Sequence, residues 1–139
     1  MLKDLIEKYY FSGNYTCAET MLHAANEYYG LDLPEREMKL VSGFGGGMQT
    51  GNVCGALLAA ISVLSLRYVE AKAHESADIK PVTQLLTERF ADALNKSLLC
   101  REIRPVYFRE EVRCLAVVQT ACDVLEQVIR EYEESRIQP

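Results

Sequence analysis

The chain has 139 residues, of which 49% are hydrophobic and 25% are charged, a length and balance typical of one globular domain with a sizeable core. Its formal net charge of −5 and scattered basic residues argue against nucleic acid and anionic lipid as partners. Five cysteines, an odd number, argue against a fixed disulfide framework and leave thiol chemistry, metal binding or burial as their roles.

The N-terminal residues predict where the protein works. They read MLKDLIEKYY, and Asp4 and Glu7 interrupt the apolar stretch that a secretory signal needs. The longest apolar run, residues 53–66, is shorter than the roughly 20 residues that span a bilayer. We therefore expect a cytoplasmic protein with no membrane insertion.

Two helices are predicted before the first long loop. Apolar side chains repeat at helical spacing over residues 2–12, and Gly13 follows where a left-handed C-terminal cap would lie. The segment Thr16–Glu19 has the form of a capping box, so a second helix is expected from here to Gly30. Cys17 then falls in the first turn of this helix.

A glycine-rich loop is expected to lead into a central helix. A short helix begins after Pro34 and is stopped by Gly43, where the stretch GFGGGMQTGNVCGA (residues 43–56) begins. Within this stretch Asn52 is a good N-cap, and residues 53–72 read as a helix whose small side chains allow close packing. We expect this helix to lie at the centre of the fold.

The second half of the chain also reads as helical. A polar connection covers residues 73–80, Pro81 begins the next helix, residues 97–105 form a break with a short turn, and a last helix covers 108–134. No strand pattern competes with these helices. The sequence therefore predicts an all-α, single-domain bundle over residues 1–139, with about five to six helices.

The glycine-rich loop does not have the pattern of a phosphate-binding loop. A P-loop needs a Lys and a hydroxyl residue after its last glycine, and Asn52 and Val53 stand there instead. The dinucleotide fingerprint also fails, in spacing and because a helix rather than a strand precedes the loop. We interpret the glycines as residues that let backbone amides approach sulfur or a cofactor, and the candidates are Gly45, Gly46, Gly47 and Gly55.

The cysteines fall into two groups by their predicted positions. Cys54 is expected in the second position of the central helix, where the helix dipole favours the thiolate, and Cys17 has the same setting. Cys100 lies near the start of the short turn. Cys114 is expected inside the last helix, pointing into the bundle, and Cys122 reads as a buried small hydrophobe.

The order of these features resembles the C_GCAxxG_C_C family of small redox-active proteins. The resemblance rests on Cys17-Ala18, on the Phe-Gly-Gly-Gly-Met loop that runs into Cys54-Gly55-Ala56, and on two later single cysteines, and it covers nearly the whole chain. It implies that the four family cysteines are Cys17, Cys54, Cys100 and Cys114, with Cys122 as an extra. Ala59 replaces the last glycine of the family pattern.

Two hypotheses of different classes follow. In the first, Cys17, Cys54, Cys100 and Cys114 converge as metal ligands or redox-active groups in a small redox protein, holding a metal or iron–sulfur centre or cycling between dithiol and disulfide. Cys54 is then the expected most reactive thiolate, and a redox partner protein is implied. In the second, the chain is a binding or assembly module with structural cysteines or a structural zinc site. The long last helix is compatible with a homodimer.

Other groups carry weaker signals. His23 and His74 have no paired spacing to each other or to a nearby cysteine, which argues against a Cys–His nucleophile or a histidine metal site. Arg101 and Arg104 flank Cys100, where they either lower the pKa of its thiol or hold a surface turn.

Overall fold

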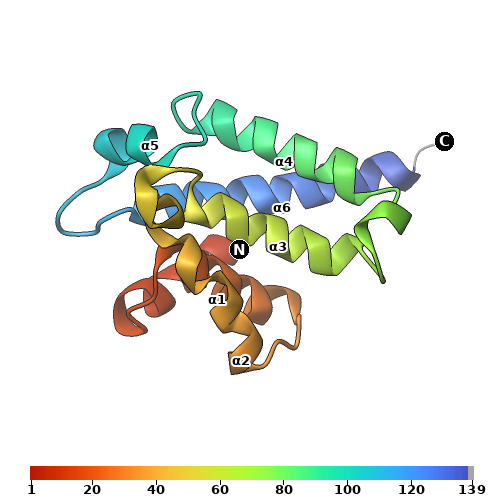
Figure 1. The fold of residues 1–139 in the computed structure, drawn as a ribbon, viewed down its shortest axis with the longest axis horizontal. Coiled ribbons are helices and arrows are strands. Elements are labelled where there is room, and N and C mark those ends of the chain that lie inside the picture. Colours follow the sequence, from red (N-terminus) through yellow and green to blue (C-terminus); the bar gives the residue numbers. More distant parts are fainter. Residues whose placement is uncertain (138–139) are drawn as a thin grey trace.

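The chain is all α in the computed structural model, which describes residues 1–137 (Figure 1). The α-helices in this part are α1 (Cys17–Tyr29), α2 (Glu35–Met38), α3 (Gly55–Tyr68), α4 (Ile79–Ala93), α5 (Cys100–Tyr107) and α6 (Leu115–Ile137). Short 3-10 or π turns complete it at Leu2–Leu5, Lys8–Ser12, Lys39–Phe44, Gly47–Gly51 and Ala73–Glu75. The predicted all-α fold class is confirmed.

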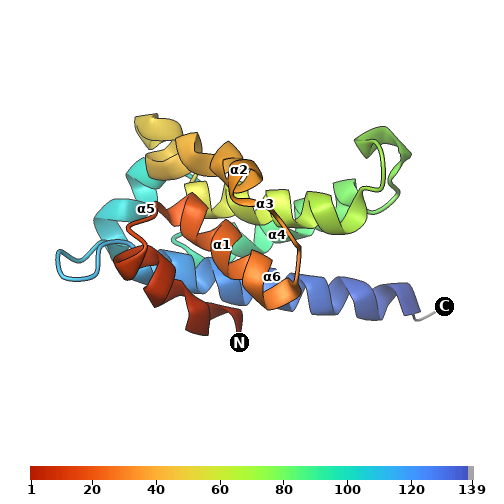
Figure 2. The same cartoon turned by 90° about the horizontal axis from the view of Figure 1, so that it is seen from below.

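The central helix predicted from the sequence is α3. It packs against α1, α4 and α6, and small or aliphatic side chains are buried on most of its surface. Helices α3, α4 and α6 run along the long axis of the molecule, and α1 lies across them (Figures 1 and 2). Ala59 is fully buried in this core. Within residues 1–137 no helix is long and apolar enough to cross a membrane.

The boundaries of α3 differ from the prediction of residues 53–72. The helix begins at Gly55 because Val53 pairs with Leu99 in an antiparallel bridge, which keeps the backbone before the helix extended. It ends at Tyr68, since Val69 is again extended at φ −113° and ψ 117°. Asn52 is therefore not its N-cap. The residue in the N-cap position is Cys54, and this changes the surroundings of its thiol.

The predicted start of the last helix was also wrong. Residues 108–114 form a tight turn closed by pairing of Arg109 with Arg113, and α6 begins only at Leu115. The expected break before it contains α5, a helix that continues through Pro105 to Tyr107. Cys114 therefore precedes α6 instead of lying inside it.

Three smaller boundaries differ for local reasons. Gly13 has φ −80° rather than a left-handed conformation, because its N–H closes a wide turn onto the Lys8 carbonyl. Helix α4 begins two residues before Pro81, where the first turn needs no N–H donor. A 3-10 turn continues past Gly43 to Phe44. The left-handed cap at Gly30 is confirmed, with φ 62°.

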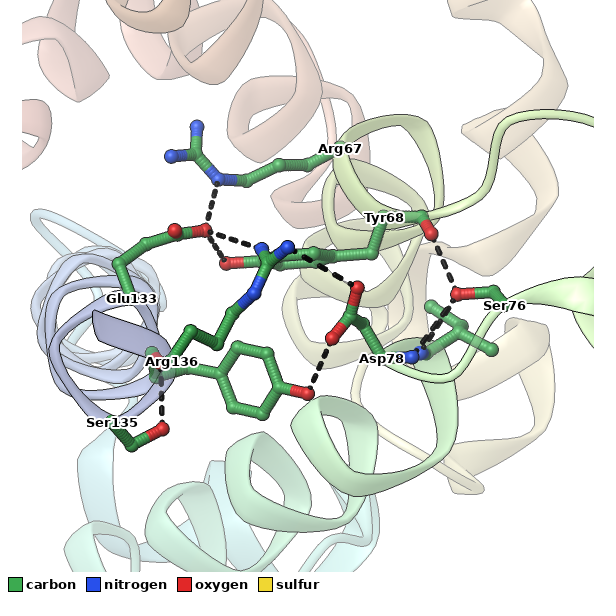
Figure 3. Close-up of polar contacts among 9 residues, drawn as sticks. Arg67, Tyr68, Ser76, Asp78, Glu133, Ser135 and Arg136 are labelled. Carbon is green, nitrogen blue, oxygen red and sulfur yellow. Dashed lines mark hydrogen bonds and ion pairs between the residues drawn. The ribbon is translucent and has the colours of Figure 1, made fainter. Parts of the chain in front are cut away.

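A polar network ties α3, α4 and α6 together at the end of the molecule away from the glycine loop (Figures 1 and 3). The Tyr68 hydroxyl donates to the Glu133 carboxylate at 2.7 Å. The Tyr132 hydroxyl donates to Asp78 at 2.7 Å, and Arg136 lies within ion-pair distance of both carboxylates. These bonds join the last turns of α3 and α6 to the start of α4.

Removing one of these hydroxyls is expected to destabilise the fold modestly. We expect Tyr68→Phe to lower the free energy of unfolding by about 0.5–1.5 kcal/mol, because it removes one of the two hydrogen bonds that the Glu133 carboxylate accepts. Urea unfolding measures the change. Tyr107→Phe is the matched control, because the Tyr107 hydroxyl has no hydrogen bond within residues 1–137. Equal losses in both variants would show that the network adds nothing to stability.

Candidate functional site

The four cysteines predicted to form the site each lie at the start of a helix. The Thr16 side chain caps α1, accepting from the Glu19 N–H at 3.3 Å, while Glu19 accepts from the Thr16 N–H at 3.1 Å. This capping box, predicted from the sequence, makes Cys17 the first residue of α1. Cys54 directly precedes α3, Cys100 is the first residue of α5, and Cys114 directly precedes α6.

The segments before α3 and α5 are bonded to each other. The Cys54 N–H donates to the Leu98 carbonyl at 2.8 Å, and the Cys100 N–H donates to the Asn52 carbonyl at 2.7 Å. These bonds flank the bridge between Val53 and Leu99. Because side chains alternate along extended backbone, Cys54 and Cys100 share the face opposite to the bridged pair.

The four cysteines surround one cavity of about 210 Å³, which we call the inner cavity. The side chains around it come from the N-terminal turn, α1, the glycine loop, α5 and the start of α6. Its lining residues are Tyr10, Tyr15, Thr16, Cys17, Gly46, Cys54, Gly55, Cys100, Ile103, Arg104, Phe108, Arg113, Cys114 and Val117. Cys122 is absent from this lining. It is fully buried elsewhere, with its sulfur 3.9 Å from the Met21 sulfur.

A second, more open hollow of about 640 Å³ adjoins the first, and we call it the outer basin. It is lined by Gly46, Gln49, Gly51, Cys100, Arg101, Arg104, Pro105 and Phe108. Cys100 and Arg104 line both hollows, and Cys100 is the only cysteine in the lining of the basin. Among the four, Cys100 is therefore the thiol that a molecule in the outer basin would meet.

Two of the loop glycines, Gly47 and Gly55, bring backbone close to the cysteines. A Cβ at Gly55 would lie 2.5 Å from the Phe44 carbonyl oxygen and 2.9 Å from the Cys17 sulfur. A Cβ at Gly47 would lie 2.7 Å from the Cys100 Cβ. Gly46 and Gly55 line the inner cavity, whereas Gly45 and Gly47 do not. Contact of these glycines with a cofactor stays a prediction.

The loop also holds a rare backbone conformation. Gly46, Gly47, Met48 and Gln49 follow one another with φ values of 62°, 65°, 60° and 60°. A left-handed conformation costs roughly 1–2 kcal/mol for each residue that carries a Cβ. Met48 and Gln49 hold it, Gln49 in the wall of the outer basin, and strain of this kind gathers at functional sites.

Burial is the largest influence on the pKa values of Cys17 and Cys54 in the protein without a cofactor. Loss of solvent raises the pKa of Cys54 to about 12, although the backbone amides of Ala56 and Leu57 act in the opposite direction. Burial raises the pKa of Cys17 in the same way, against the amides of Gly46, Ala18 and Ala56. The expectation that Cys54 is a ready thiolate was therefore wrong for the cofactor-free chain. Its helix position is favourable, but desolvation outweighs it.

Burial also raises the pKa of Cys114, while the guanidinium groups of Arg104 and Arg113 act to lower it. Repulsion from a neighbouring thiolate also raises the pKa of Cys17 and that of Cys54, because these sulfurs lie near one another. Four thiolates could not coexist in this cavity without a compensating positive charge.

The raised pKa of Cys54 predicts a pH dependence of stability in the cofactor-free chain. A thiol whose pKa is higher in the folded state stabilises the fold below its unfolded pKa and loses that contribution as the pH rises through the folded pKa. For Cys54 this window runs from its ordinary value of 9.0 to about 12. We expect the melting temperature to fall above pH 9 and to fall less steeply in Cys54→Ala. Parallel slopes in both proteins would contradict the assignment.

Several residues of the site carry no clear signal in the sequence. The Tyr10 hydroxyl accepts a hydrogen bond from the Cys114 N–H at 3.1 Å, and Arg113 donates to the Tyr10 carbonyl at 3.0 Å. The Arg113 guanidinium also lies 4.4 Å from the centre of the Tyr10 ring. These pairs are far apart in sequence, so only the fold brings them together. Phe108, beneath the guanidinium of Arg104 at 4.5 Å, is a further case.

The arginines and histidines near the cysteines are now placed. Arg101 and Arg104 were expected either to act on the Cys100 thiol or to hold a surface turn. Both line the outer basin together with Cys100, and Arg104 also lines the inner cavity. His23 stacks on Tyr15 at 4.1 Å and lines neither hollow. His74 lies in the turn at Ala73–Glu75.

The four thiols are spread around the inner cavity and do not gather at one point. Within the described residues, 1–137, no three Cys, His, Asp or Glu side chains come close enough together to hold a single metal ion. The four thiols instead stand around a hollow of about 210 Å³. The structural zinc site of the second hypothesis has no support from these positions.

Fold and cavity together define a small all-α protein with a four-cysteine site. The chain belongs to the family described as "Putative redox-active protein (C_GCAxxG_C_C)", whose model matches residues 15–128. The family predicted from the sequence is thereby confirmed. No curated protein and no solved structure matches the chain.

Proposed function

We propose that this redox-active family member is a cytoplasmic electron carrier that holds an iron–sulfur cluster in the inner cavity. Cys17, Cys54, Cys100 and Cys114 would be the ligands. The observation that carries the proposal is the placement of these four thiols, each at a helix start, around one hollow of about 210 Å³. Four cysteine thiolates are the usual ligand set of iron–sulfur clusters.

Packing supports a bulky occupant. Protein interiors are filled to the density of organic crystals, so a hollow of this size between one buried and three half-buried thiols leaves room for a bound group. The lining includes aromatic and aliphatic side chains such as Tyr15, Ile103 and Val117, which would keep water from the cluster. When bound, a cluster supplies one-electron transfer, and its iron ions deprotonate the thiols that coordinate them.

The residues of this chain would set the properties of the centre. Backbone amides of Gly46 and Ala56 act on the Cys17 sulfur, and those of Ala56 and Leu57 act on Cys54. Amide donors near cluster sulfur raise the reduction potential because they stabilise added negative charge. The guanidinium groups of Arg104 and Arg113, which line the cavity, act in the same direction.

Thiol exchange is the second candidate, because Cys100 faces the outer basin. In this reaction the Cys100 thiolate attacks a disulfide of a partner protein, forming a mixed disulfide and releasing one partner thiolate. A second cysteine of the four then attacks the Cys100 sulfur, forming an internal disulfide and releasing the other partner thiolate. The chain is oxidised and the partner is reduced. The burial of Cys54, which is 5% exposed, favours the cluster over this reaction.

One experiment separates the two candidates. The full chain is purified without oxygen, treated with iron and sulfide, and analysed for bound iron, sulfide and visible absorption. Alkylation mapped by mass spectrometry then counts protected cysteines. The cluster predicts iron and sulfide in similar amounts, with the four ligand cysteines protected from alkylation. A colourless, iron-free product would overturn it, and reversible formation of a single disulfide in that product would favour thiol exchange.

A further inference from the structure

We infer that the outer basin is a binding site for a small organic anion that lies against Cys100. The basin has a volume of about 640 Å³, within the range of about 300–1,000 Å³ that is usual for small-molecule sites. Its walls come from the left-handed glycine loop on one side and from α5 with Phe108 on the other.

The charge of the basin is opposite to that of the whole chain. Its lining contains Arg101 and Arg104 and no Asp or Glu, although the chain carries a net charge of −5. Within residues 1–137, neither arginine forms an ion pair, whereas Arg67, Arg89 and Arg136 each pair with a carboxylate. Two guanidinium charges are therefore free to meet a ligand.

The polar groups suit carboxylate or phosphate oxygens. A guanidinium presents its N–H donors in a planar fork that matches both of these anions. Arg104 lies over the Phe108 ring at 4.5 Å, which restricts its guanidinium. Gln49 adds an amide from the strained part of the loop, where its φ is 60°. Pro105 and Phe108 give the basin an apolar wall for the carbon skeleton of an organic anion.

The position of the basin gives the ligand a role. Gly46, Cys100, Arg104 and Phe108 belong to both hollows, so a molecule in the basin would lie beside the only cysteine that lines it. The inference of an anion-binding site rests on the lining of the outer basin and does not require the cluster. Any effect of the bound anion on the redox centre rests on the proposed function.

Alkylation of Cys100 in the cluster-free full chain tests the site without a known ligand. Anionic iodoacetate and neutral iodoacetamide react in the same way: the Cys100 thiolate attacks the methylene carbon, a C–S bond forms, iodide leaves, and the thiol proton goes to solvent. The ratio of the two rates cancels the pKa of the thiol and reports how well an anion enters the basin.

We expect this rate ratio at Cys100 to exceed that of the urea-unfolded chain. It should fall about three- to tenfold in the double variant Arg101→Gln/Arg104→Gln, because two charges near the reacting sulfur are removed. Arg36→Gln removes one charge from α2, away from the basin, and serves as the control. A ratio that equals the unfolded value, or that is unchanged in the double variant, would overturn the inference.

A second measurement needs no variant. Citrate and inorganic phosphate should each slow iodoacetamide at Cys100 of the wild-type chain, compared with sodium chloride of equal ionic strength. Citrate alone would indicate a carboxylate site, and phosphate alone a phosphate site. No slowing by either would contradict anion binding. Iron loading is measured separately. If iodoacetate is preferred in an arginine-dependent way but the chain holds no iron, the anion site is supported and the cluster is overturned. If the chain holds iron but shows no such preference, the cluster is supported and the anion site is overturned.

Discussion

We expect a single serine substitution to reduce the iron retained after reconstitution to below about a tenth of the wild-type amount, when it replaces Cys17, Cys54, Cys100 or Cys114. Each of these four thiols lines the inner cavity, and serine offers an alkoxide ligand that forms only at much higher pH. Iron and sulfide analysis after gel filtration without oxygen measures the loss, and the visible spectrum reports it independently.

Cys122→Ser is the matched control, because the same substitution is made outside the cavity. The Cys122 side chain is fully buried against Met21, so a hydroxyl there loses its solvent without gaining a described partner. We expect this variant to lose about 1–3 kcal/mol of stability and to keep its iron. Substitution at Cys122 thus lowers stability and spares the iron, whereas substitution at a cavity cysteine removes the iron. Iron retained equally in all five variants would contradict the cluster.

The helical fold could be predicted from the sequence because its signals are local. The apolar repeat of Val82, Leu86, Phe90 and Leu94 gave α4, whose inner face is buried as that spacing requires. The capping box at Thr16 gave the start of α1 and therefore the place of Cys17. In both cases the residues that decide the structure lie within a few positions of each other.

The start of α6 could not be predicted in the same way. Val112 continues the apolar repeat of the last helix backwards, so the periodic pattern extends beyond the helix itself. The turn at Arg109–Arg113, in which Arg113 has φ 54°, prevents the helix from beginning earlier. This turn places Cys114 at a helix start instead of a helix face. The common setting of the four cysteines therefore became visible only in three dimensions.

The chemistry of the site was only partly accessible from the sequence. A helix start does favour a thiolate, but the size of the opposing desolvation depends on how many distant segments cover the sulfur. Tyr10 illustrates this, because it reaches Cys114 from the turn at Lys8–Ser12. The glycine loop shows the same limit: its composition indicated close packing, and the fold determined what it packs against.

The tightest of these contacts predicts a large effect from one added methyl group. Gly55→Ala would place a Cβ 2.5 Å from the Phe44 carbonyl oxygen and 2.9 Å from the Cys17 sulfur. Backbone cannot move aside cheaply at the buried start of α3, so we expect a loss of about 1–3 kcal/mol or more in the free energy of unfolding. Because the methyl group also displaces Cys17, iron retention should fall with it.

Gly43→Ala is the control for Gly55→Ala, since it makes the same change in the same loop without a clash. Gly43 is exposed, its φ is not in the left-handed region, and a Cβ there would meet nothing within 4 Å. Its substitution should leave iron content unchanged and alter stability by less than about 1 kcal/mol, because alanine mainly restricts the unfolded chain. Urea unfolding and iron analysis of both variants test the pair. If Gly55→Ala matched Gly43→Ala in both measurements, the Gly55 backbone could not lie against Cys17 as described. The packing that places Cys17 among the proposed ligands would then be contradicted.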